Sequence, residues 1–154
     1  MRRENSAHDG LTLPPWMRRW VFAAGLVCLL SGVLWLVFHN FMTTEGEFGP
    51  AAHPLERWWL VLHGGAALVV AWVLGLIWLG HVRRGLQSGR YFVSGVGILL
   101  LILFLLLSGW GLYYLGDESW REWTATAHWI VGLVVAAWLP LHAGFGRRDA
   151  HDGR

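Results

Sequence analysis

Four long apolar runs, separated by short polar stretches, dominate the pattern of the chain. They extend over residues 20–41, 58–82, 92–115 and 123–145. At about 1.5 Å per residue, each run is long enough to cross the hydrocarbon core of a bilayer as an α-helix. The pattern therefore predicts an all-α fold, a transmembrane up-down bundle of four helices with little of the chain outside the membrane.

The predicted bundle forms one domain, which extends over residues 18–148. Residues 1–17 are polar and then turn-rich, which predicts a cytoplasmic tail with an interfacial lead-in, and residues 149–154 form a second cytoplasmic tail. The connection at residues 42–55 contains two glycines and two prolines, so we expect a loop with turns there rather than a further domain.

Composition agrees with a membrane protein, since 55% of the residues are hydrophobic and 14% are charged. Cys28 is the single cysteine, which excludes a disulfide within the chain and the two-cysteine attachment of a covalent haem. The pI near 9.2 does not indicate nucleic-acid binding, because the arginines stand at membrane boundaries, where they meet anionic headgroups.

The charges are distributed unequally between the two sides of the predicted bundle. Ten of the 12 basic residues precede the first run, lie between the second and third, or follow the fourth: Arg2, Arg3, Arg18, Arg19, Arg83, Arg84, Arg90, Arg147, Arg148 and Arg154. The other two connections hold Arg57, Arg121, Glu45, Glu47, Glu56, Asp117, Glu118 and Glu122. The positive-inside rule therefore predicts that both termini are cytoplasmic and that the acidic connections face outward.

Two histidines lie in the second apolar run and two in the fourth. His63 and His81 are 18 residues apart, which is five helical turns, so they share a face at an axial separation of about 27 Å. His128 and His142 are 14 residues apart, within about 40° of one face and about 21 Å along the axis. Because an ionisable side chain at membrane depth is costly, we interpret these four as functional.

Alternate helices of an up-down bundle lie diagonally across its core, so the two histidine faces can confront each other. This predicts an outer pair, His63 with His128, and an inner pair, His81 with His142. Two neutral imidazoles on opposite sides of a planar macrocycle provide both axial bonds of a b-type haem. The sequence therefore predicts two haem b groups, whereas a zinc or copper site would need ligands clustered around one point.

Other residues agree with these sites without defining them. Gly95 and Gly109 in the third run are 14 residues apart, the same separation as the histidines of the fourth run, and either serve helix packing or make room for a flat cofactor. Arg83, Arg84 and Arg147 are predicted to neutralise haem propionates at the inner surface. Gly25 and Gly32 share a face of the first run and permit a similarly close approach. His39 is interpreted as an interfacial polar residue, and His53 as a solvent-facing one.

Two short motifs carry a resemblance to a known group. The LHGG at His63 and the pattern AHW…LPLH from Ala127 to His142 resemble the small four-helix diheme membrane cytochromes b, including bacterial cytochrome b561 and the gamma subunits of membrane-bound formate dehydrogenases. The resemblance covers most of residues 18–148. It implies a bacterial inner (cytoplasmic) membrane location and haem ligation by His63, His128 and His142.

The chain departs from that group at the inner haem. The group takes its last inner ligand from the start of the first helix, where this chain has no histidine between His8 and His39. His81 is the substitute, similar to the two-helix ligation in the cytochrome b of bc complexes. The two axial separations then differ by about one helical turn, which helix tilt, a kink at Pro140 or imidazole rotamers would have to absorb. Otherwise the inner haem is absent or uses His8.

These observations predict an electron-transfer subunit of an oxidoreductase complex rather than a stand-alone enzyme. It would carry electrons across the bilayer between a quinone pool and a redox partner, a basic cytochrome or an extracytoplasmic catalytic subunit docked on the acidic outer face. The alternative is a haem-free membrane anchor or assembly subunit whose histidines only bridge helices. Proton-relay transport fits poorly, because no intramembrane carboxylate accompanies the histidines.

Overall fold

The computed structural model describes residues 13–88 and 92–152, and the side chains of 88, 92 and 145–152 are outside that description. The long helices are α2 (Pro15–Phe41), α3 (Pro54–Ile77), α5 (Phe92–Gly111) and α6 (Glu118–Asp152). The π-helix η1 (Trp78–Val82) and the short helix α4 (Arg83–Ser88) continue α3, and strands β1 (Thr43–Gly46) and β2 (Gly49–Ala52) connect α2 to α3.

Four of these segments are long and apolar enough to cross a membrane, which indicates a multi-pass membrane protein. They are Pro15–Phe41, Pro54–Gln87, Val93–Gly111 and Glu118–Gly144. The four predicted spans are thus present, but three of them begin earlier than predicted, at Pro15, Pro54 and Glu118. Pro15 and Pro54 each occupy the first turn of a helix, where the missing N–H of proline leaves no hydrogen bond unmade.

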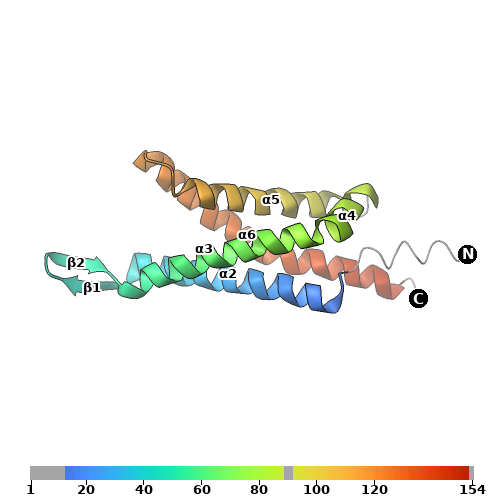
Figure 1. Cartoon of the computed structure of the whole chain (residues 1–154), viewed down its shortest axis with the longest axis horizontal. Helices are drawn as coiled ribbons and strands as arrows, with labels where there is room; N and C mark the ends of the chain where they lie inside the picture. Colours follow the sequence, from blue (N-terminus) through green and yellow to red (C-terminus); the bar gives the residue numbers. More distant parts are fainter. Residues whose placement is uncertain (1–12, 89–91, 153–154) are drawn as a thin grey trace, which may run out of the picture.

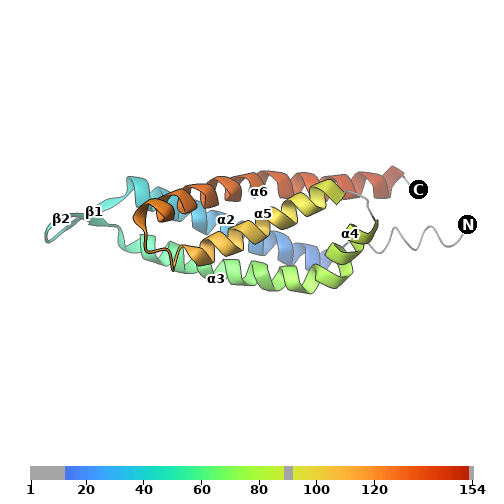
Figure 2. The same cartoon turned by 90° about the horizontal axis from the view of Figure 1, so that it is seen from above.

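The helices pack as two hairpins, α2 against α3 and α5 against α6, which meet through fewer contacts of α2 with α6 and of α3 with α5 (Figures 1 and 2). Among the described residues, the buried hydrophobic side chains are Ala24, Ala66, Val73 and Ile98, and the buried polar ones are Ser31 and Ser108. Large apolar side chains are exposed along all four helices, as expected for surfaces that face lipid.

The connection between α2 and α3 is a β-hairpin that projects from the helices at the end opposite the start of α2 and the end of α6 (Figure 1). The strands pair antiparallel from Thr43 with Ala52 to Gly46 with Gly49. Gly49 has a φ of 117°, which a residue with a side chain rarely adopts. The expected turns are present, but the strands were not predicted.

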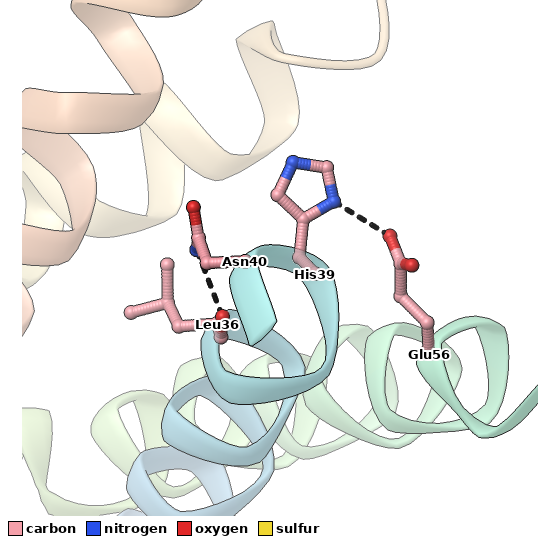
Figure 3. A network of polar contacts seen from close by, with 4 residues as sticks. All are labelled: Leu36, His39, Asn40 and Glu56. Carbon is pink, nitrogen blue, oxygen red and sulfur yellow. Dashed lines mark hydrogen bonds and ion pairs between the residues drawn. The ribbon is translucent and has the colours of Figure 1, made fainter. Parts of the chain in front are cut away.

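Polar contacts join α2 to α3 beside this hairpin (Figure 3). His39 Nδ1 lies 2.7 Å from Glu56 Oε1, and the imidazole stacks on Trp35 with ring centroids 4.7 Å apart. The His39 side chain is 53% exposed, as expected for an interfacial residue. His53 has a structural role that the sequence did not reveal, because its Nδ1 accepts a hydrogen bond from the Leu55 N–H and caps α3.

Candidate functional site

The structure brings the four predicted histidines together in the two predicted pairs. The ring centroids of His63 and His128 are 6.1 Å apart, with planes at 82°. Those of His81 and His142 are 6.5 Å apart, with planes at 76°. Each pair joins the α2–α3 side of the molecule to α6, and all four side chains are half-buried. The two sites therefore lie between the helical hairpins.

These separations can be compared with the geometry of two axial imidazoles. An imidazole–metal bond of about 2.0 Å, added to about 1.1 Å from Nε2 to the ring centre on each side, places the ring centroids about 6.2 Å apart. The observed 6.1 and 6.5 Å agree with that value. The centroid spacing of each pair is thus compatible with two imidazoles on one iron ion.

Hydrogen bonds at Nδ1 set the orientation of the outer pair. His63 Nδ1 lies 2.8 Å from the carbonyl oxygen of Cys28, which can only accept, so the proton is on Nδ1. His128 Nδ1 lies 2.8 Å from Ser108 Oγ, and that hydroxyl donates to the carbonyl oxygen of Leu105 at 3.3 Å. Ser108 therefore accepts from His128. In a neutral ring protonated at Nδ1, Nε2 carries the lone pair that a metal needs.

The inner pair has a similar contact on one side. His142 Nδ1 lies 3.1 Å from Ser94 Oγ. Within the described part of the chain, every hydrogen bond of His63, His128 and His142 involves Nδ1, which leaves Nε2 of each for a ligand. His81 belongs to the π-helix η1 rather than to a regular α-helix. Single π-turns occur often at functional sites.

Three of the imidazoles pack closely against a glycine. A Cβ atom on Gly32 would stand 2.9 Å from His63 Cε1, one on Gly109 would stand 3.2 Å from His128 Cε1, and one on Gly95 would stand 3.8 Å from His142 Cε1. Gly109 and Gly95 thus lie at the levels of His128 and His142, as their spacing predicted. The space that these glycines leave is filled by the histidine rings. Gly25, in contrast, has no atom within 4 Å of such a Cβ.

The donor set fits a haem better than a bare metal ion. No group of three or more His, Cys, Asp or Glu side chains that could hold a metal is found in the described residues. The imidazoles come in twos, and a porphyrin would supply the other four bonds to iron. The glycine positions agree with this interpretation, because close packing against glycine restricts three of the four imidazoles.

The structure defines the predicted role of the arginines less well than that of the histidines. Arg83 and Arg84 are exposed at the start of α4, directly after the π-helix that carries His81. Arg147 lies in α6, but its side chain is outside the described residues, and His8 is outside them entirely. A contact of these arginines with propionates therefore stays a prediction.

The serines that contact the histidines were not predicted from the sequence. Ser94 and Ser108 bond to His142 and His128, and Ser31 Oγ lies 3.5 Å from His63 Nδ1. Each serine directly precedes a glycine that supports the same imidazole, so a Ser-Gly dipeptide occurs at each of the three contacts. The repeated dipeptide was the signal that could have located them.

No family model, curated protein or solved structure matches this chain. The assignment of the site therefore depends on the residues and geometry described above.

Proposed function

We propose that this chain is a membrane diheme b-type cytochrome subunit that carries electrons across the bilayer between a quinone pool and a redox partner. The observation that supports it most is the spacing of the two imidazole pairs, with ring centroids 6.1 and 6.5 Å apart. The distribution of arginines supports an up-down bundle with both termini on the cytoplasmic side, in a bacterial inner membrane.

In this proposal, His63 and His128 hold the outer haem and His81 and His142 hold the inner one. A bound haem supplies an iron ion that accepts and releases one electron. Cys28, Ser108 and Ser94 orient three of the imidazoles through Nδ1, which would leave their Nε2 atoms to hold the iron. Arg83, Arg84 and Arg147 follow the inner histidines, where positive charge would neutralise propionates.

The redox partner would dock at the outer end, on the β-hairpin and the acidic connections. Glu45, Glu47 and Phe48 belong to the hairpin, and Phe48 is 98% exposed. Asp117 and Glu118 stand at the start of α6. An exposed aromatic side chain among carboxylates suits a basic cytochrome or a basic face of an extracytoplasmic catalytic subunit. The chain would then work as one subunit of a larger complex.

Haem content tests the proposal directly. The chain should be expressed with ample haem supply and purified, and a dithionite-reduced minus oxidised spectrum should show a b-type α-band. Pyridine haemochrome analysis is expected to give two haems per chain. A variant with all four paired histidines replaced by alanine is the control for adventitious haem, and equal haem content in both proteins would contradict the proposal.

A haem-free anchor or assembly subunit is the second candidate. It is favoured by the bonds of His63, His128 and His142 to backbone and serine oxygens, since such contacts also occur when histidines only bridge helices. A folded, colourless wild-type protein would support this alternative. Replacing each histidine by glutamine, which retains hydrogen-bonding groups, should then leave its thermal stability almost unchanged.

A further inference from the structure

The indole of Trp59 carries a buried N–H group without a visible acceptor. Its Nε1 atom is shielded from solvent and has no hydrogen-bond partner in the part of the chain that the structure describes. An indole N–H can only donate, and buried tryptophans almost always place this group against an acceptor. The described chain therefore provides no acceptor for the Trp59 indole N–H.

The position of Trp59 relates this N–H group to the outer histidine pair. Trp59 stands four residues before His63 on α3, so the two share a face and are about 6 Å apart along the helix axis. Its ring also contacts Phe38 of α2, with centroids 6.3 Å apart. Trp59 would therefore lie close to a group held by His63. Trp58, in contrast, is 67% exposed.

The nearest acidic group on α3 is already engaged. Glu56 stands three residues before Trp59, and its Oε1 atom lies 2.7 Å from His39 Nδ1 (Figure 3). At this end of the molecule, the arginines are Arg57 of α3 and Arg121 of α6, whereas Arg83 and Arg84 directly follow the π-helix that carries His81. A carboxylate at the outer site would thus depend more on neutral N–H donors than a carboxylate at the inner site.

We propose that Trp59 Nε1–H donates a hydrogen bond to a propionate carboxylate of the haem held by His63 and His128. The inference rests on the proposed function, because it requires a haem at the outer pair. It assigns Trp59 as a binding residue for the outer group and predicts that the indole offsets part of the carboxylate charge near the iron.

Replacing Trp59 by phenylalanine tests the inference, with Trp58→Phe as the matched control on the adjacent, exposed indole. Both variants are expected to retain two haems. In Trp59→Phe, the midpoint potential of the outer haem should become more negative, because a carboxylate without its donor stabilises ferric iron. The potential of the inner haem should not change. The redox-induced infrared bands of the propionates should shift in Trp59→Phe alone.

The outcomes separate this inference from the function on which it rests. A wild-type protein without haem overturns the proposed function. Two haems in all proteins, with identical titrations of Trp59→Phe and Trp58→Phe, overturn the role of Trp59 alone. Loss of a co-purified quinone with unchanged haem potentials would identify the acceptor as a quinone carbonyl and also overturn the propionate assignment.

A third measurement applies if Trp59→Phe does not retain the outer haem. Infrared spectra of the wild type with ¹⁵N-labelled indoles should then show a response of the propionate bands to the label. The absence of any response would overturn the inference.

Discussion

The outer and inner histidine pairs have nearly the same spacing, but the chain achieves it in different ways. Both outer histidines lie in regular α-helices, and their Nδ1 atoms are 2.8 Å from oxygen acceptors. In the inner pair, His81 lies in a π-turn, and His142 Nδ1 lies 3.1 Å from its serine. The outer pair therefore lies in continuous secondary structure, and the inner pair includes a local departure from it.

The glycine contacts also differ between the outer and the inner pair. Hypothetical Cβ atoms on Gly32 and Gly109 would come within 2.9 and 3.2 Å of the outer imidazoles, whereas the equivalent distance for Gly95 at the inner pair is 3.8 Å. A glycine backbone packed closely against an imidazole leaves the ring few alternative rotamers. Preorganised ligands of this kind bind a cofactor with less loss of entropy. We expect the outer haem to be bound more tightly and to tolerate fewer changes nearby.

The largest effect is expected from removing one axial ligand of either pair. His128→Ala should reduce the haem content from two per chain to one by loss of the outer haem, and His142→Ala should do the same by loss of the inner haem. The remaining haem reports that the protein is still folded. His53→Asn, outside both pairs, retains a side-chain acceptor for the cap of α3 and is the control, and haemochrome analysis with a redox titration provides the measurement. Unchanged haem content in a paired-histidine variant would remove that residue from the ligands.

The π-turn can be removed to test whether the inner site alone depends on it. Deleting Leu79, which is 66% exposed, would allow α3 and α4 to join as a continuous α-helix. A π-turn takes up one extra residue of an α-helix, so after the deletion the 17 residues from His63 should leave His81 close to its present direction. Both haems should then be retained, as measured by haem content. Leu79→Ala keeps the chain length and is the control; loss of the inner haem from the deletion variant alone would show that the π-turn itself places His81.

Glycine substitutions compare the tolerance of the two pairs. Gly32→Ala and Gly109→Ala force a Cβ against His63 or His128 and should destabilise the haem-bound protein by about 1–3 kcal/mol, as overpacking usually does. Gly95→Ala should cost less, because 3.8 Å is an ordinary contact distance. Gly25→Ala is the control, since nothing lies within 4 Å. Thermal denaturation, followed at the haem absorption band, measures the destabilisation caused by each substitution. Equal destabilisation by all four substitutions would contradict the difference between the sites.

The membrane spans and the histidine pairs were predictable from the sequence. The spans depend on the length of an apolar run, and the shared histidine faces depend on periodicity within single helices. The spacing of His63 and His81, and of His128 and His142, placed each set on one face. The difference between the two axial separations was also apparent from the sequence. How the structure accommodates this difference was not apparent. Nothing in the residues Trp78–Val82 distinguishes a π-turn from an α-helix, because the turn depends on how α3 meets the rest of the molecule.

The serine contacts were not predicted for a related reason. A serine within an apolar helix can bond to its own backbone, as Ser31 does with the Val27 carbonyl oxygen at 2.7 Å. Whether it also contacts a histidine depends on which helices are neighbours, and a single sequence does not show this. The β-hairpin depends on a positive φ at Gly49, directly after the bulky Phe48. The sequence did not reveal this backbone conformation either.

The smallest effect is expected from the serine hydroxyls, which influence the imidazoles without touching the iron. Ser108→Ala removes the acceptor of His128 Nδ1–H, makes the imidazole a weaker base and should raise the outer midpoint potential. A hydrogen bond worth about 1 kcal/mol corresponds to about 40 mV for one electron. Ser94→Ala should raise the inner potential by less, because its contact with His142 is 3.1 Å rather than 2.8 Å. Potentiometric titration of both variants measures the two shifts, and a larger shift at the inner haem would reverse the order that the hydrogen-bond lengths predict.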